Sequence, residues 1–433
     1  MQRGQFTEAR PALEVLSEQD PDDQFALYYL ARTYEEAGER DKAAENYEKL
    51  RYFKLEEGGK IPGYLGGLVA KLGEYGISGR QEVVNIVSFL VWQEEWGEVE
   101  EVLARMGEKY PYDPEWAFYR GEMYHRRGKL EEALRRYERA IELDPQYAEV
   151  YLRIGMVYEE KALTPKPEAP SPPFEEAAKW YAKYHALAPD DLLGLKKLVE
   201  ICEELERAGI EPETLGLQPK ALREELARRT DDRRIVAELL SVPVEAVELG
   251  ENLVENGGFE VWRDGRPEGW AWSNMATGDP CNLALFVGGV EEFEAYEGHR
   301  AMRVDGFWIQ RKPELEGARA GYWGGEIELK PDRPYVLSFY YRTRNLREGE
   351  AAIWVSYDAE VLFSGDHMLP DTEGEWRKFV IIGWNRKGEM GKIKPLLRSW
   401  GVGDIWFDGV RLEEVAMKPQ VGIEEASTVF QLR

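Results

Sequence analysis

The chain has 433 residues, of which 43% are hydrophobic, and a net charge of −26. This length predicts two or three domains, and the hydrophobic content excludes a disordered chain. Residues 250–415 contain 20 basic and 29 acidic side chains, a net charge of −9, so the rest of the chain carries −17. Because such a surface repels phosphate backbones, we expect no nucleic-acid partner, and anionic membrane surfaces are disfavoured for the same reason.

Cysteines and apolar runs give little information about the compartment. Cys202 and Cys281 fall in what we predict to be different domains, so we do not expect a disulfide between them. The sequence has no run of 18 or more apolar residues, so we expect no membrane span in this chain. The first residues, MQRGQFTEAR, lack the apolar core of a signal peptide. The compartment therefore stays open.

The first half of the chain contains a repeat, seen most clearly in residues 114–145, PEWAFYRGEMYHRRGKLEEALRRYERAIELDP. Small, aromatic and helix-ending residues recur there at fixed offsets: Gly121, Tyr124, Gly128, Ala133, Tyr137, Ala140 and Pro145. Gly121 and Ala133 let two helices cross closely, Gly128 ends the first helix and Pro145 stops the second. These offsets match the 34-residue tetratricopeptide pattern, so the segment resembles a tetratricopeptide repeat.

The same phase continues on both sides of this segment. The copy that starts at Gln24 has Leu30, Ala31, Tyr34, Gly38, Ala43, Tyr47 and Leu50. The copy that starts at Ala148 has Tyr151, Ile154, Gly155 and Tyr158, and resumes with Ala177, Tyr181 and Pro189. A weaker copy starts at Arg80, with Val87 at the small position, followed by Leu90, Val99, Leu103 and Pro111. We therefore predict an α-solenoid over residues 1–209, built of antiparallel helix pairs.

Several segments depart from the repeat. Residues 51–79 are rich in glycine and predict an inserted helix, and the proline-rich residues 163–173 predict a loop between paired helices. Ala9, Leu13, Leu16 and Pro21 match only the second helix of a repeat. Either the partner helix is missing, which would make the chain a fragment of a longer protein, or residues 4–20 form the solenoid cap. Residues 210–249 read as a helical cap or linker.

At Asn252 helical periodicity gives way to short alternating strands rich in Val, Ile, Tyr and Trp. In YVLSFYYRT (335–343), the residues Tyr335, Leu337, Phe339 and Tyr341 share one face. We expect residues 250–415 to form an all-β sandwich of jelly-roll type, followed by a tail over 416–433. The fold class is thus an α-solenoid followed by a β-sandwich.

The second half also carries motifs of a known family. They are NLVENGGFE (252–260), PEGW (267–270), GHRAMRV (298–304), LKPDRPYVLSFYYR (329–342), Trp376 to Phe379, and DIWFDGVRLEEV (404–415). Their order and spacing resemble the galactose-binding-like jelly rolls found among carbohydrate-binding modules of extracellular enzymes. The resemblance implies an extracytoplasmic or cell-surface location and contact with a polysaccharide.

Ten of the fourteen tryptophans fall in residues 250–415, and aromatic rings stack on the C–H faces of sugars. Trp270, Trp376 and Trp406 lie in framework motifs, so we assign them to the core. The candidates for carbohydrate binding are Trp272, Trp308, Trp323, Trp354, Trp384 and Trp400. Each of these six has core packing as its alternative role.

We find no catalytic motif in the sequence: no HExxH, paired CxxC, P-loop or nucleophile elbow. The histidines are scattered, at His125, His185, His299 and His367. We therefore expect no enzyme. The jelly-roll resemblance implies one structural calcium ion, for which the matching carboxylates are Glu260 and Asp408, with backbone carbonyls to complete the shell. Two solvated carboxylates are the alternative.

Three functions follow from these features. In the first, the chain is a non-catalytic binding or scaffold protein, whose solenoid docks a protein partner and whose sandwich contacts glycan. In the second, it is a structural subunit of an assembly that self-associates, and the sandwich is a spacer with buried tryptophans. In the third, it is the soluble tail of a membrane-bound glycan-processing enzyme.

Overall fold

The computed structural model describes residues 5–50, 63–163, 174–274, 285–307, 319–355, 366–385 and 388–418. The chain groups into two compact units. Unit 1 comprises Met1–Tyr147, Ala276–Val287 and Gly306–Ala318, and unit 2 comprises Ala148–Met275, Gly288–Asp305 and Arg319–Arg433. Within the described ranges, no helix combines the length and the apolar character needed to cross a membrane.

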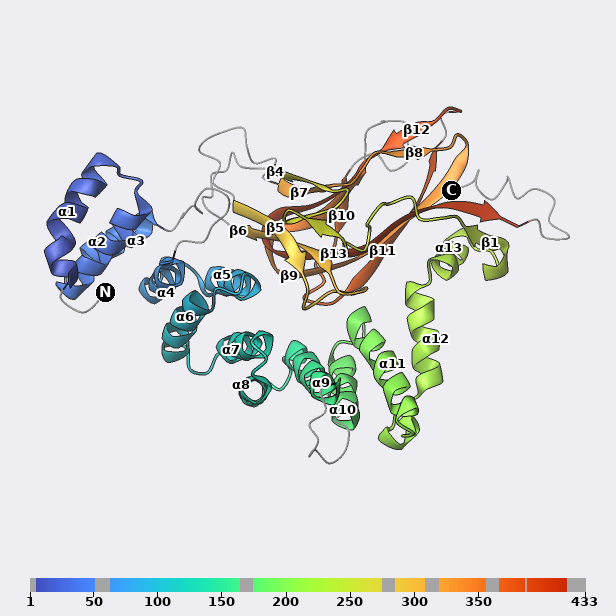
Figure 1. Ribbon diagram of the computed structural model, residues 1–433, viewed down its shortest axis with the longest axis horizontal. Helices are drawn as coiled ribbons and strands as arrows, with labels where there is room; N and C mark the ends of the chain where they lie inside the picture. Colours follow the sequence, from blue (N-terminus) through green and yellow to red (C-terminus); the bar gives the residue numbers. More distant parts are fainter. Residues whose placement is uncertain are drawn as a thin grey trace. The chain divides into compact units, whose positions relative to one another are not determined.

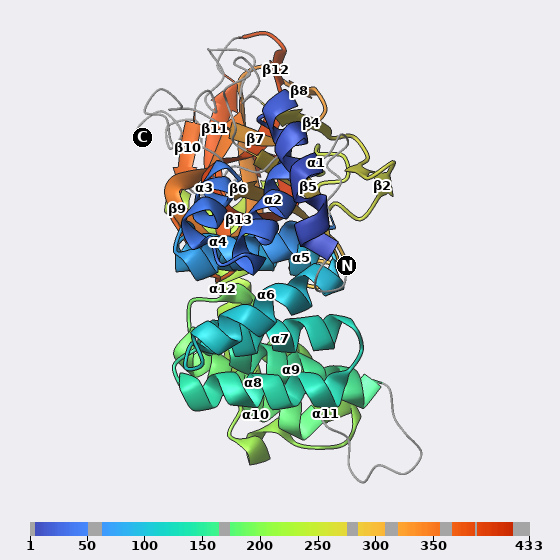
Figure 2. The same cartoon turned by 90° about the vertical axis from the view of Figure 1, so that its left-hand side faces the viewer.

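The described part of unit 1 is helical from Gln5 to Leu143 (Figure 1), and it also includes the first residues of β5 and the last residues of β6. Its helices are α1 (Gln5–Gln19), α2 (Gln24–Glu36), α3 (Arg40–Lys49), α4 (Leu65–Tyr75), α5 (Arg80–Trp92), α6 (Trp96–Lys109), α7 (Pro114–Arg126) and α8 (Leu130–Leu143). The predicted repeat starts Gln24, Arg80 and Pro114 are the first residues of α2, α5 and α7. Helices α7 and α8 lie side by side in both views of the ribbon (Figures 1 and 2). The repeat phase read from the sequence is therefore confirmed here.

The small residues of the repeat lie where the helices meet. A Cβ atom on Gly121 of α7 would come within 3.0 Å of the Tyr137 ring of α8, so only glycine fits without movement. Tyr137 is fully buried, and its hydroxyl donates a hydrogen bond to Glu122 Oε1 at 2.8 Å. Glycine thus brings the two helices together, and the tyrosine fills the space beside it.

Helix α4 is the helix predicted within residues 51–79, and it packs mainly against α6. A Cβ atom on Gly66 would come within 3.0 Å of the backbone of Glu98, which shows how closely α4 and α6 approach. Buried Lys71 of α4 pairs with Glu35 of α2 at 2.8 Å. The glycines therefore fit the inserted helix between its neighbours. Residues 51–62 lie outside the described part.

Unit 2 begins with helices of the same kind: α9 (Ala148–Leu163), α10 (Phe174–Leu187), α11 (Leu192–Arg207), α12 (Pro219–Thr230) and α13 (Asp232–Leu240), with short 3₁₀ turns at Pro212–Leu215 and Val244–Ala246. A Cβ atom on Gly155 of α9 would come within 3.0 Å of the Tyr181 ring of α10, which repeats the contact seen in α7 and α8. Gly209, with φ of +76°, follows α11 and ends it. Residues 164–173, within the predicted proline-rich loop, lie outside the described part.

The remaining described part of unit 2 is built of antiparallel strands. Nine strands among the described residues make one sheet: β1 (Val247–Leu249), β4 (Ala271–Asn274), β5 (Leu285–Glu291), β6 (Ala301–Phe307), β7 (Arg319–Trp323), β9 (Arg333–Val355), β10 (Asp366–Leu369), β11 (Arg377–Asn385) and β13 (Pro395–Met417). The strands follow one another in the order β10-β9-β13-β6-β5. In addition, β11 pairs with β9, both β1 and β7 pair with β13, and β4 pairs with β7. Two small sheets pair β2 (Trp262–Arg263) with β3 (Arg266–Pro267), and β8 (Ile327–Leu329) with β12 (Gly391–Ile393).

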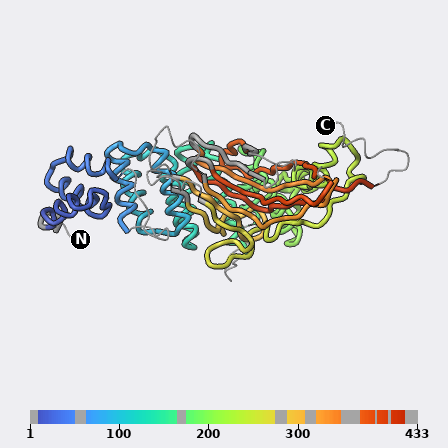
Figure 3. Tube along the Cα trace, turned by 90° about the horizontal axis from the view of Figure 1, so that it is seen from above, coloured from blue at the N-terminus to red at the C-terminus, as the bar shows by residue number. Residues whose placement is uncertain are grey.

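The long strands β9 and β13 run side by side through this sheet (Figure 3). Their register is interrupted after Trp400, Val402 and Asp408, where β-bulges bend the pair. Along β9 the predicted core face is buried, but so is the opposite face, which includes Ser338 and Arg342. The second face of β9 is buried because helices of unit 2 cover it.

The helices and the sheet of unit 2 share a small apolar core. It joins Val236 and Ala237 of α13 to Val247 of β1, Val336 of β9 and Val415 of β13. The domain boundaries predicted at 209/210 and 249/250 stay predictions; helices lie on both sides of 209/210, and β1 (Val247–Leu249) lies just before 249/250. The compact units instead divide after Tyr147, because α9–α13 pack with the strands that follow them.

Candidate binding surfaces

The three tryptophans assigned to framework motifs are core residues in the structure. Trp270 is 5% exposed, and Trp376 and Trp406 are fully buried. Trp270 packs on Phe259 with ring centroids 5.1 Å apart, and its indole N–H donates to the Glu255 carbonyl at 3.3 Å. These tryptophans therefore contribute to packing.

The six tryptophans predicted to bind carbohydrate fall into two groups. Trp308 lies outside the described residues, as do the side chains of Trp354 and Trp400. Trp272, Trp323 and Trp384 are half-buried.

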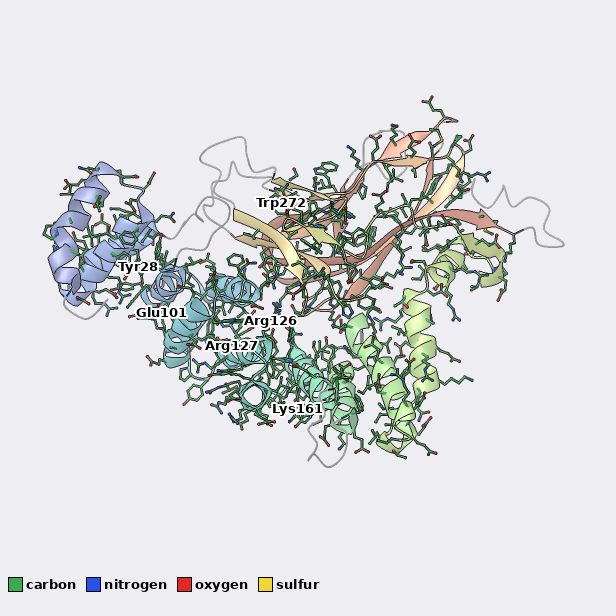
Figure 4. All side chains as sticks on the ribbon, viewed as in Figure 1. Tyr28, Glu101, Arg126, Arg127, Lys161 and Trp272 are labelled. Atoms are coloured by element: carbon green, nitrogen blue, oxygen red, sulfur yellow. The ribbon has the colours of Figure 1, made fainter. Side chains whose placement is uncertain are left out.

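Trp272 on β4, labelled in Figure 4, packs against the interior of the β-region. Its ring centroid lies 4.9 Å from that of Tyr322. A Cβ atom on Gly288 would come within 3.0 Å of the same indole, so glycine makes room for it. Trp323 lies opposite Ala271, and Trp384 lies opposite Pro334. The structure thus does not bring the three described candidates together into one stacking platform.

A cluster of arginines surrounds buried Trp406 on one face of the sheet. The guanidinium carbons of Arg303, Arg342 and Arg344 lie 4.7, 5.0 and 5.1 Å from the centre of its ring. Aromatic rings attract cations at such distances, and the attraction strengthens where water is excluded. Trp406 therefore helps to hold three positive charges, and each of them also has carboxylate partners.

The carboxylates come partly from helix α9. Glu149 Oε1 accepts from Arg342 Nη2 at 2.7 Å and from Arg344 Nη1 at 3.0 Å. Glu294 accepts from Arg342 at 3.0 Å and also pairs with buried Arg153 of α9. Burial alone would raise the pKa of Glu149, but Arg344, Arg342 and Arg153 outweigh burial and lower its pKa to about 2. Glu149 is therefore an anion that joins α9 to the sheet.

Deeper in the same face, buried Arg303 binds both oxygens of Asp305, at 2.7 and 2.9 Å. It also lies 3.3 Å from Glu291 and 3.7 Å from Asp404. Burial raises the pKa of Asp305 to about 7, and this rise persists although Arg303 acts against it. The group is a neutralised network of buried charges, in which each guanidinium has carboxylates beside it.

Helices α11 and α13 also contact this face. Asp191, the N-cap of α11, accepts hydrogen bonds from the Gly194 and Trp376 amides, each at 2.6 Å. Asp232 of α13 pairs with Lys378 of β11 at 2.8 Å and accepts from Ser338 of β9 at 2.8 Å. We call this side of the sheet the covered face, defined by Ser338, Arg342, Arg344, Trp376, Lys378 and Trp406. Sequence reasoning missed it, because alternating charged residues in strands normally indicate a solvent-exposed face.

The two predicted calcium ligands both bind the loop at residues 296–300. Asp408 Oδ2 accepts from the Tyr296 and Glu297 amides at 2.9 and 2.7 Å. Glu260 Oε1 accepts from the His299 and Arg300 amides at 2.8 and 3.1 Å. Amide N–H groups repel a cation, so these contacts fit the holding of a loop better than the binding of calcium.

In the part of the chain that the structure describes, no group of three or more His, Cys, Asp or Glu side chains is arranged to hold a metal ion. The calcium ion stays a prediction of the sequence.

Comparison with protein families identifies tetratricopeptide repeats in this chain. A model described as "Tetratricopeptide repeat" matches residues 1–52, and one described as "TPR repeat" matches residues 121–161. Both matches fall on the helices in which the repeat phase was read. The helical region is thus tetratricopeptide-like, and antiparallel sheets follow it. No curated protein matches the sequence.

Solved structures give remote likenesses only. The enzymatically active domain of tailspike protein 4 of bacteriophage CBA120 is 13% identical, with a TM-score of 0.26; the match covers 39% of this chain and 21% of the tailspike chain. TmCBM61, solved with β-1,4-galactotriose, is 21% identical, with a TM-score of 0.26. The match covers 39% of this chain and 100% of the TmCBM61 chain. YrrB, described as a TPR protein with an unusual peptide-binding site, is 22% identical, with a TM-score of 0.24. The match covers 44% of this chain and 82% of the YrrB chain. All three TM-scores are below 0.5.

Proposed function

We propose that this chain is a non-catalytic scaffold protein whose tetratricopeptide repeats dock a protein partner. The observation that carries the proposal is the repeated glycine–tyrosine helix contact, at Gly121 with Tyr137 and at Gly155 with Tyr181. Gly121, Tyr137 and Gly155 lie in residues 121–161, which match the repeat family. Repeats of this class stack into extended surfaces that bind other proteins.

For the β-region, the described contacts favour a structural role over glycan binding on the covered face. A sugar needs an accessible aromatic ring flanked by free hydrogen-bonding groups. On the covered face, Trp406 is buried and Arg342 is 1% exposed, and the neighbouring carboxylates come from the chain itself. We therefore propose that this jelly-roll-like region is a platform on which α9, α11 and α13 pack, which corresponds to the spacer hypothesis.

Glycan contact is the second candidate function. It is supported by the half-buried tryptophans Trp323 and Trp384 and by the family resemblance of the motifs. Trp384 lies on the same side of β11 as Lys378, six residues further along the strand. Affinity electrophoresis of the full chain against a panel of soluble glycans tests it, with Trp323→Ala and Trp384→Ala as variants. Retardation that either variant weakens about ten-fold would support the candidate. Unchanged mobility with every glycan would remove it.

Site-specific photo-crosslinking in cells that express the chain tests the docking function. The crosslinker replaces Phe25 on α2 or Arg120 on α7, the first helices of two repeats, and exposed Glu48 on α3 or Glu138 on α8, the second helices. We expect one discrete crosslinked protein from both first-helix positions and none from the two controls. Crosslinks of equal yield at all four positions, or none at any, would contradict docking.

A further inference from the structure

The N-terminal part of unit 1 carries an exposed aromatic surface beside carboxylates. Helix α2, which begins at its N-cap Asp23, presents Phe25 and Tyr29 one turn apart on one side. Phe25 is 48% exposed although it is a large apolar residue, and Tyr29 is half-buried. Their ring centroids lie 4.5 Å apart. Two contacting rings are therefore accessible from solvent.

A third ring joins them from the start of helix α4. The Tyr64 centroid lies 6.5 Å from that of Phe25 and 6.4 Å from that of Tyr29, with interplanar angles of 73° and 68°. Below them, Tyr64 stacks on buried Tyr28 at 5.0 Å and 20°, which fixes its orientation. The three accessible rings thus form a surface held in place by a buried fourth.

Helix α6 supplies the carboxylates next to these rings. Gly67 of α4 lies against both Tyr28 and Glu101, which are labelled in Figure 4. A Cβ atom on Gly67 would come within 3.0 Å of the Tyr28 hydroxyl and would lie 3.1 Å from both carboxylate oxygens of Glu101. Glu101 therefore lies beside Tyr28. Glu98 Oε2 accepts from the Gly66 amide at 2.5 Å. Burial raises the pKa of Tyr29; the charge of Arg32 opposes this rise, and the charges of Glu98 and Glu101 add to it. Both carboxylates therefore lie near the exposed rings.

The cations in the neighbourhood already have partners of their own. Arg32 donates to the Tyr28 hydroxyl at 3.0 Å and lies 3.5 Å from Glu35. Arg105 lies 3.2 Å from Glu101 and 3.6 Å from Glu74, yet the Glu101 side chain remains 39% exposed. We call Phe25, Tyr29, Tyr64, Glu98 and Glu101 the aromatic–acidic surface. Its rings and carboxylates both attract a positive charge.

We propose that the aromatic–acidic surface binds lysine or arginine side chains of a basic segment in the protein partner. This inference rests on the docking function proposed above and specifies the partner's chemistry. The rings offer cation–π contact at an exposed site, and Glu98 and Glu101 add ion pairing. The net charge of −26 attracts the same kind of partner at long range.

The test is a fluorescence-anisotropy titration of the full chain with a labelled oligolysine peptide at low ionic strength. Removing one ring or one carboxylate, with Phe25→Ala or Glu101→Gln, is expected to weaken binding about two- to five-fold. A peptide of the same length with acetylated lysines should not bind, because acetylation removes the charge. Circular dichroism and a melting curve verify that each variant is folded.

Two matched variants separate the surface from bulk charge. Glu100→Gln removes the neighbouring carboxylate of α6, which pairs with Arg127 at 2.9 Å, and Tyr112→Ala removes an aromatic side chain that is 81% exposed. Neither variant should change the affinity. No binding of oligolysine, or equal weakening by Glu100→Gln and Glu101→Gln, would overturn the inference. If first-helix positions still crosslink a protein partner in that case, the docking function stands and only the basic segment is refuted.

Discussion

Replacing Glu149 with glutamine should weaken the packing of α9 on the sheet. The substitution keeps the shape of the side chain but removes the anion that binds Arg342 at 2.7 Å and Arg344 at 3.0 Å. Arg342 is 1% exposed, so its charge would be left with Glu294 as its remaining carboxylate in the described network. Removal of one partner from a buried ion pair is strongly destabilising, because the other charge stays buried.

The size of this effect follows from the pKa of Glu149. A shift from 4.5 to about 2 corresponds to about 3 kcal/mol of stability, at roughly 1.4 kcal/mol for each pH unit. Because the folded-state pKa is lowered, this stability is present above pH 4.5 and is lost as the pH falls toward 2. We therefore expect Glu149→Gln to cost about 2–3 kcal/mol at pH 7, or about 5–10 °C in Tm. The difference from the parent chain should shrink between pH 4.5 and 2.

Differential scanning calorimetry measures this loss, and hydrogen exchange of peptides from α9 and β9 locates it. The matched control is Glu224→Gln on α12, whose side chain is 69% exposed and lies 4.0 Å from Lys220. Such an exposed pair contributes little, so the control should stay within about 0.5 kcal/mol. A Glu149→Gln variant as stable as the control, or a loss that persists unchanged at pH 2, would refute the reasoning.

The remaining predictions concern helix packing and calcium. Gly121→Ala should destabilise unit 1 by about 1–2 kcal/mol in a thermal melt, because the added Cβ would meet Tyr137. The control Gly97→Ala, with nothing within 4 Å of its Cβ, should be neutral or stabilising by up to about 1 kcal/mol. Equal effects of the two substitutions would mean that the α7–α8 crossing relaxes freely. If one calcium ion binds Glu260 and Asp408, a chelator should lower the Tm of unit 2 and added calcium should restore it. An identical Tm with and without chelator would refute the calcium site, and the two carboxylates would then serve only to hold the loop at residues 296–300.

The sequence predicts local features of this chain well. Gly121 and Tyr137 mark a helix crossing because only a small residue fits against the Tyr137 ring where α7 and α8 meet. The first residues of α2, α5 and α7 follow from the same spacing. Tryptophans are harder to assign, since Trp272 and Trp406 differ in burial but not in the kind of strand that carries them.

The carboxylates Glu260 and Asp408 show a further limit of the sequence. The jelly-roll resemblance implied that these two carboxylates act together. They do act on the same loop, through the amides of residues 296–300. Which chemical partner each oxygen takes depends on the loop's backbone orientation, and side-chain spacing carries no information on that orientation.

The sequence by itself determined the helical repeats and the antiparallel strands, because periodicity, glycine positions and turn residues act over a few neighbouring residues. Only the tertiary structure decided that the strand face carrying Arg342, Arg344 and Trp406 is buried. Its partner Glu149 lies 193 residues from Arg342 along the chain. Charged residues alternating along a strand predict exposure to water, since burying a charge is costly. Here helix α9 brings the opposite charges to them, so the same pattern forms a buried interface.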